Sequence, residues 1–267
     1  MQRGAATVGA DPVAVIVSSD GSMAYTADSS PGDVYAVRLP QLTVAWKQHV
    51  GGAPFGLLLG EGHLFVSLFS AAAVVELDPS SGKELARHTV PDGPAAMALD
   101  PVGRVVVACL DGKAARMDGV TLSAGNGYGV ALAGGTLWTA DYKRAELVPA
   151  GDDHPVALPL QVSPFWLAPG SSGALLIAAE GASEDSDPGA VLSYDDMSAT
   201  FKTLARPRDP DQVIQVGSTI LVAAHGDLNV LAIQGDRSST WAPGAAAVAL
   251  APDTPLNMLV VAVNAHE

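Results

Sequence analysis

The stretch APFGLLLGEGHLFVSLFSAAAVVELDPSSGKELARHTV, residues 53–90, decides the fold. It holds four short strand-like segments, at residues 56–59, 64–68, 73–77 and 84–90, with turn residues between them. The turn DPSSGK at residues 78–83 carries a proline and a glycine, which suit the backbone angles of a tight turn. The stretch therefore predicts one four-stranded antiparallel sheet whose outer strand, rich in charged residues, meets water.

The first half of this pattern, two apolar runs joined by a turn, returns seven times along the chain. Equivalent positions in the second run are spaced by 31 to 45 residues and are occupied by Tyr25, Val66, Val107, Trp138, Ile177, Val222 and Val261. A period near forty residues built from short strands is typical of a β-propeller, in which each repeat is one blade. We therefore predict an all-β, seven-bladed β-propeller that occupies residues 1–267 as a single domain.

The two ends of the chain suggest how the ring would close. Residues 3–12, RGAATVGADP, resemble the outer-strand passage LARHTVPDGP at residues 85–94. The last repeat ends after its second strand, near Val263, and shows no third strand. We expect the N-terminal strand to join the last blade and so to remove an open sheet edge.

Composition and charge limit the possible partners. The chain is 48% hydrophobic and carries a net charge of −14, and it contains no apolar run long enough for a transmembrane helix. The negative charge disfavours nucleic acid as a partner. The single cysteine, Cys109, excludes an internal disulfide. We expect a monomer that binds a protein or a small molecule.

The N-terminal residues MQRGAATVGAD lack the apolar core of a secretory leader. Either no leader exists, or it was removed before this numbering begins. We favour an extracytoplasmic location with the leader already removed, and a cytoplasmic location stays open.

One residue of each repeat lies where the second strand ends, at the expected mouth of the central channel. Aligning the repeats gives Asp28, Phe69, Leu110, Asp141, Glu180, His225 and Asn264 at this position. Polar side chains here follow small apolar residues, which indicates a binding rim. Among them, Asp141, Glu180 and His225 are candidate ligands for a divalent cation, Ca²⁺ or Mg²⁺. The alternative is that these side chains bond the backbone of the following turn.

Aromatic residues gather at the same predicted rim. Phe55, Tyr128, Phe165 and Trp166 lie at the start of first strands, and Phe69 and Tyr142 follow second strands. Only 5% of the chain is aromatic, so this grouping favours a recognition surface for a small molecule, a sugar or a peptide side chain. Side-chain contacts between neighbouring blades would explain it equally well.

Two features of the repeats resemble a known group of proteins. Pro12 followed by Asp20-Gly21, and the passage from Val66 to Gly82-Lys83, resemble the YVTN-type and NHL-like bacterial propeller repeats. The resemblance implies a scaffold whose members include surface-layer proteins, binding modules and virginiamycin B lyase-like enzymes. We expect a binding or interaction propeller, with a metal-assisted lyase or hydrolase and an architectural surface or envelope module as the alternatives. Apart from a divalent cation, no cofactor is evident in the sequence.

Overall fold

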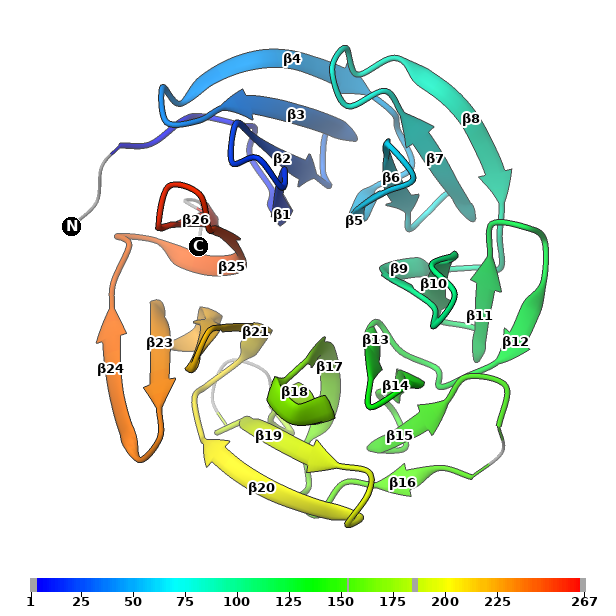
Figure 1. Cartoon of the computed structure of the whole chain (residues 1–267), viewed down its shortest axis with the longest axis vertical. Coiled ribbons are helices and arrows are strands. Elements are labelled where there is room, and N and C mark those ends of the chain that lie inside the picture. The colour runs from blue at the N-terminus through cyan, green and yellow to red at the C-terminus, as the bar shows by residue number, and fades with distance from the viewer. Residues whose placement is uncertain (1–3, 153, 184–186, 265–267) are drawn as a thin grey trace.

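The computed structural model describes residues 4–152, 154–183 and 187–264. The described residues form antiparallel sheets arranged like blades around a central axis, with the first strand of each sheet innermost (Figure 1). This confirms the β-propeller.

Six of these sheets are complete blades of four consecutive strands each. The blades are numbered in chain order, and within each blade the strands run from the innermost to the outermost. Blades 1 and 2 comprise β1 (Pro12–Val17), β2 (Met23–Asp28), β3 (Asp33–Arg38), β4 (Thr43–His49), β5 (Pro54–Gly60), β6 (His63–Leu68), β7 (Ala73–Leu77) and β8 (Glu84–Thr89). Blades 3 and 4 comprise β9 (Pro94–Leu99), β10 (Val105–Cys109), β11 (Lys113–Arg116), β12 (Thr121–Ser123), β13 (Val130–Ala133), β14 (Thr136–Asp141), β15 (Glu146–Pro149) and β16 (Val156–Ala157). Blades 5 and 6 comprise β17 (Ser163–Pro169), β18 (Leu175–Glu180), β19 (Ala190–Asp195), β20 (Thr200–Ala205), β21 (Pro210–Val216), β22 (Thr219–Ala224), β23 (Asn229–Gln234) and β24 (Arg237–Trp241).

Two single turns of 3₁₀ helix, η1 (Ser171–Gly173) and η2 (His225–Asp227), interrupt the loops. The last repeat forms a separate two-stranded sheet of β25 (Ala246–Asp253) and β26 (Met258–Asn264).

Burial follows the position of a strand within its blade. All five residues of β10 and all six of β18 are buried, because both faces of a second strand contact neighbouring blades. The outermost strand β24 is exposed along its whole length. This gradient explains why second strands read as continuous apolar runs while outer strands carry the charged residues.

The hydrophobic core is divided into clusters, each of which lies between two neighbouring sheets. One cluster joins blades 1 and 2 through residues such as Val34 and Leu64, and another joins blades 4 and 5 through residues such as Trp138 and Ile177. The sheet β25–β26 takes part in the same way, since Ala249 packs with Val15 of blade 1 and Leu250 with Ala223 of blade 6. The ring is therefore continuous through side-chain contacts.

The prediction of seven blades closed by the N-terminal strand is wrong. The described residues form six blades, and the seventh repeat supplies only the two strands β25 and β26. Residues 4–10 form no strand. Ala6 and Val8 pack instead onto the cluster that joins blade 1 to β25–β26.

The physical reason lies in how the N-terminal segment is held. The Asp28 carboxylate accepts hydrogen bonds from the backbone N–H groups of Ala10, at 3.2 Å, and Asp11, at 2.7 Å, which tie the segment to blade 1. Gly9 has a φ of 117°, and a Cβ atom there would lie 1.4 Å from Asp28 Oδ2. Gly9 therefore lets the chain approach Asp28 closely enough for both hydrogen bonds to form, and no strand pairs with β26 on that side within the described residues.

No helix within the described residues is long and apolar enough to cross a membrane. Cys109 is fully buried, and burial raises the pKa of its thiol to about 12. The thiol is therefore protonated at neutral pH and behaves as a small apolar side chain.

Candidate functional site

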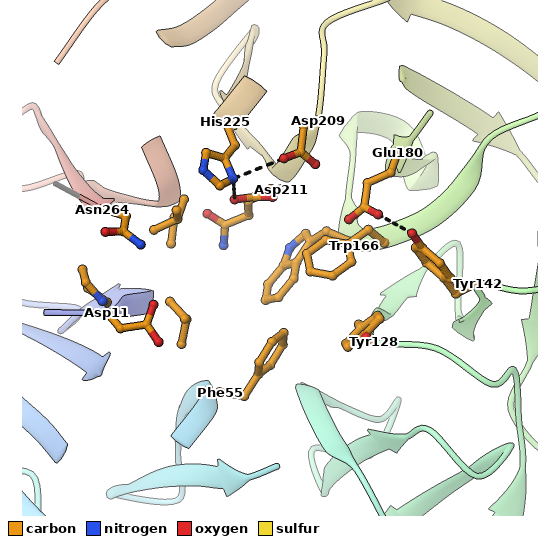
Figure 2. A pocket seen from close by; sticks show the side chains of 16 residues that line it. Asp11, Phe55, Tyr128, Tyr142, Trp166, Glu180, Asp209, Asp211, His225 and Asn264 are labelled. Carbon is orange, nitrogen blue, oxygen red and sulfur yellow. Dashed lines mark hydrogen bonds and ion pairs between the residues drawn. The ribbon is translucent and has the colours of Figure 1, made fainter. Parts of the chain in front are cut away.

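A cavity of about 690 Å³ lies at the mouth of the central channel, where first strands begin and second strands end. Its walls combine aromatic rings with carboxylates, one imidazole and two amides (Figure 2). A volume of this size suits a small organic ligand.

β-Bulges direct side chains into this cavity. The inner strands β1, β5, β17, β21 and β25 each contain a break in register at their mouth end. Residues within these breaks line the cavity, namely Val13, Phe55, Phe165, Asp211 and Val248. A bulge adds a residue to one strand only and so re-aims its side chain. Among these five positions only Asp211 carries a charge.

Aromatic rings from three blades form one wall of the cavity. Tyr128, which precedes β13, is at the centre of the wall. The centroid of its ring lies 5.8 Å from that of Phe55, 4.8 Å from that of Phe165 and 5.9 Å from that of Tyr142. Trp166 lines the same cavity (Figure 2). These contacts hold the rings in fixed orientations, which suits a binding surface because little side-chain entropy remains to be lost on binding.

An acid–imidazole cluster occupies the part of the cavity formed by blade 6. His225 Nδ1 lies 3.2 Å from Asp209 Oδ2 and 3.3 Å from Asp211 Oδ2. The backbone N–H of His225 donates to the Asp209 carbonyl at 2.9 Å, which fixes η2 against the start of β21. One ligand atom from each of the three side chains lies within 4.8 Å of the other two. Two carboxylates and an imidazole are a donor set that divalent metals accept.

Glu180 connects the acidic and aromatic parts of the wall. It ends β18, is only 6% exposed, and accepts a hydrogen bond of 2.5 Å from the Tyr142 hydroxyl. A carboxylate so far removed from water interacts more strongly with a nearby charge than one on the surface does.

Most residues expected at the rim do line the cavity. They are Phe55, Tyr128, Tyr142, Phe165, Trp166, Glu180, His225 and Asn264. Phe69 is not among the lining residues, and its ring stacks behind Tyr128 with the centroids 6.1 Å apart.

Asp28 and Asp141 accept hydrogen bonds from backbone N–H groups and do not line the cavity. Asp28 binds the N-terminal segment, and burial raises the pKa of its carboxyl despite the two N–H groups, which act in the opposite direction. Asp141 accepts hydrogen bonds from the backbone N–H groups of Asn126, at 3.3 Å, and Arg144, at 2.9 Å. The turn-bonding alternative therefore describes Asp141, which binds Arg144 in the following turn, whereas Asp28 binds the segment that precedes β1.

The three candidate metal ligands are not brought together. Among the described residues, the group with metal-ligand spacing contains His225 but neither Asp141 nor Glu180. Its carboxylates come from Asp209 and Asp211, at the start of β21.

Sequence reasoning missed Asp11, Asp209, Asp211 and Gln212, which also line the cavity. A signal for Asp211 was present, since it follows Pro210 just as Val13 follows Pro12, Phe55 follows Pro54 and Phe165 follows Pro164. Aligning the repeats on this proline rather than on the second strand alone would have placed Asp211 at the mouth.

Comparison with known proteins supports the fold. The chain is similar to a hydrazine synthase chain from Kuenenia stuttgartiensis, with a TM-score of 0.75, 14% identity, and 98% of each chain covered. It is also similar to the β-propeller domain of Myceliophteria thermophila Cps50 (Swd1), with a TM-score of 0.74, 11% identity, and 96% of this chain and 95% of that one covered. A third similar structure is BamB from Moraxella catarrhalis, with a TM-score of 0.61, 17% identity, and 95% of this chain and 80% of that one covered.

In sequence, no protein family and no curated protein matches the chain. The resemblance to YVTN-type and NHL-like repeats is therefore supported at the level of the propeller fold only. The fold alone does not determine function, which depends on the residues of the cavity.

Proposed function

We propose that this protein is a binding propeller that takes a small organic molecule into the cavity at the channel mouth. The observation that carries the proposal is a cavity of about 690 Å³ that combines a wall of mutually supported aromatic rings with a few ionisable groups. Ligand sites have this composition, with apolar surface for affinity and a small number of polar groups for orientation.

A fragment screen by ligand-observed NMR tests the proposal. Val248→Trp would fill the mouth from the β25 bulge without removing an ionisable group. Val102→Trp is the matched control, because Val102 is 71% exposed in the turn between β9 and β10, at the opposite end of its blade from the mouth. Fragments should bind the parent and the control but not Val248→Trp. Hits that bind all three proteins equally would place the ligand site elsewhere and refute the proposal.

The Asp209–Asp211–His225 cluster favours a second candidate, a divalent-cation site of the kind a metal-assisted lyase or hydrolase would use. Ligand atoms about 2.1 Å from an ion and at right angles to one another are about 3 Å apart. The spacings of 3.2 and 3.3 Å from His225 Nδ1 are close to this value. A bound ion there would act as a Lewis acid on ligand oxygens at the mouth.

Isothermal titration with MgCl₂, CaCl₂ and ZnCl₂ tests this second candidate. Binding of one ion per chain should be lost in Asp211→Asn and kept in Asp236→Asn, since Asp236 is exposed in the turn between β23 and β24, away from the mouth. Absence of binding by all three ions would exclude it and leave the small-molecule proposal intact.

A further inference from the structure

The ionisable groups of the cavity are almost all of one sign. Within the part of the chain that the structure describes, four carboxylates line it, from Asp11, Glu180, Asp209 and Asp211, and one imidazole, from His225. Among the described residues that line the cavity, none is a lysine or an arginine. Within a concave site of low dielectric, such a one-sided set of charges attracts a ligand of the opposite sign.

Two arginines that precede β21 form hydrogen bonds with groups outside the cavity lining. Arg208 Nε donates to Asp227 Oδ1 at 2.8 Å, and Arg206 Nε donates to the Gly189 carbonyl at 2.6 Å. The Arg144 side chain is 76% exposed, with its nearest carboxylate oxygen 4.0 Å away. None of these three arginines is among the residues that line the cavity.

The aromatic wall complements a cation as well. The face of an aromatic ring carries negative charge, and a cation within about 6 Å of the centroid is attracted to it, most strongly by tryptophan. Trp166, Phe55 and Tyr128 lie around the same opening as Asp211 and the other acids (Figure 2). Buried Glu180 stands at the boundary of the two regions, bonded to Tyr142 of the aromatic wall. Ring faces and carboxylates can therefore act on one bound positive charge.

From these observations, and resting on the proposed function, we infer that the ligand of the cavity is an organic cation, an alkyl- or arylammonium group attached to an apolar body. The ammonium group is held by the ring faces and by the carboxylates of Glu180 and Asp211, and the apolar body lies against the remaining aromatic surface. An anionic ligand would meet four carboxylates, and a neutral ligand would use only part of the site.

Three probes of similar size but different charge test this inference: benzyltrimethylammonium, benzyl alcohol and benzoate. Their dissociation constants are measured by NMR titration against the full chain and against Glu180→Gln, Asp211→Asn and Trp166→Leu. Asp236→Asn is the control for loss of a remote negative charge. Circular dichroism melting of each variant confirms that it is folded.

The cation should bind the parent at least about tenfold more tightly than benzyl alcohol, and benzoate should not bind. Each of the three cavity variants should weaken the cation by about fivefold or more, and Trp166→Leu should affect benzyl alcohol much less, because leucine keeps the apolar contact but not the ring face. Asp236→Asn should leave all three constants unchanged.

Other outcomes separate this inference from the function on which it rests. If benzyl alcohol or benzoate binds as tightly as the cation, and Val248→Trp blocks that binding, the mouth is a small-molecule site but the inference of a cationic ligand is wrong. If no probe binds at the mouth, the inference and the proposed function both fail. If CaCl₂ or ZnCl₂ binds at the mouth and the ammonium probe does not, the carboxylates serve a metal ion and the inference is again overturned.

Discussion

At the scale of single residues, equivalent positions in the repeats have taken different roles. Asp28, Asp141, Glu180 and His225 all lie where a second strand ends. The first two carboxylates are buried and accept backbone N–H groups, whereas Glu180 and His225 line the cavity. The difference comes from the backbone beside each strand end, since Asp28 finds its donors in the segment that precedes β1 and Asp141 finds them at Asn126 and Arg144.

The role of Asp28 can be tested by Asp28→Ala. The substitution removes both acceptors of the Ala10 and Asp11 N–H groups, and a hydrogen bond to a charged group contributes roughly 1.5–3 kcal/mol. We expect the free energy of unfolding in urea to fall by about 2–3 kcal/mol, with probe binding at the mouth preserved. Asp236→Ala is the surface control and should change stability by less than about 0.5 kcal/mol. An equally stable Asp28→Ala variant would show that the N-terminal segment is held by other contacts.

A second test at this scale concerns Asp100 and pH. Burial alone would raise the pKa of this carboxyl, but the Arg104 and Val102 N–H groups and the Arg104 guanidinium together lower it. A carboxyl with a lowered folded-state pKa stabilises the protein above its unfolded pKa, about 3.9, and loses that contribution as pH falls through the lower folded value.

The stability difference between the parent and Asp100→Asn should therefore be largest near pH 6 and should shrink as the pH falls below about 4. Urea unfolding from pH 2.5 to pH 6 measures this difference. A difference that does not change across that range would contradict the proposed linkage.

At the scale of strands and turns, the sequence predicted much of each blade. In blade 2, the apolar run 64–68 and the turn at 78–83 define their elements without help from the rest of the ring, and β6 spans His63–Leu68, one residue more than expected. Strand propensity and turn-forming residues are enough to predict elements of this kind from the sequence.

The bulges could not be predicted from strand patterns, since a break in register depends on how the inner strand pairs with the second strand of its own blade. Asp211 reaches the cavity through such a break, so its partnership with His225 appears only in the structure. The N-terminal segment was mispredicted for a similar reason. Its sequence is compatible with a strand, but the Asp28 carboxylate and the close approach at Gly9 tie it to blade 1.

The N-terminal segment supports a prediction at this scale. Val8 is half-buried against the cluster that joins blade 1 to β25–β26, whereas the neighbouring Thr7 is exposed. Val8→Asp should lower the free energy of unfolding by about 1–3 kcal/mol, because it removes apolar contact and places a carboxylate against an apolar surface. Thr7→Asp adds the same charge one residue away and should have little effect. Equal effects of the two substitutions would mean that charge, and not burial at residue 8, causes the loss.

At the scale of the whole molecule, the ring is held by contacts between neighbouring sheets, and the two-stranded sheet is part of that chain of contacts. β25 and β26 bury Ala249, Ala251 and Ala262 with Val15 of blade 1, and they bury Ala247 and Leu250 with Ala223 of blade 6. Without this sheet, blades 1 and 6 would each expose an apolar face to water. A propeller differs in this respect from an open stack of repeats, whose ends can be capped independently.

This arrangement predicts cooperative loss of the ring when the two-stranded sheet is disrupted. Leu250 is almost fully buried, and Leu250→Ala should destabilise the protein by roughly 2–5 kcal/mol through lost apolar contact and the cavity left behind. Because the sheet joins the two ends of the ring, we expect hydrogen exchange to accelerate in blades 1 and 6 together with β25–β26, and not in blade 3 on the opposite side. Leu77→Ala, a matched truncation between blades 1 and 2, should accelerate exchange in those two blades and leave β25–β26 protected. If Leu250→Ala accelerated exchange only within β25 and β26, the two-stranded sheet would be an independent flap and the ring would be held closed by contacts other than those described.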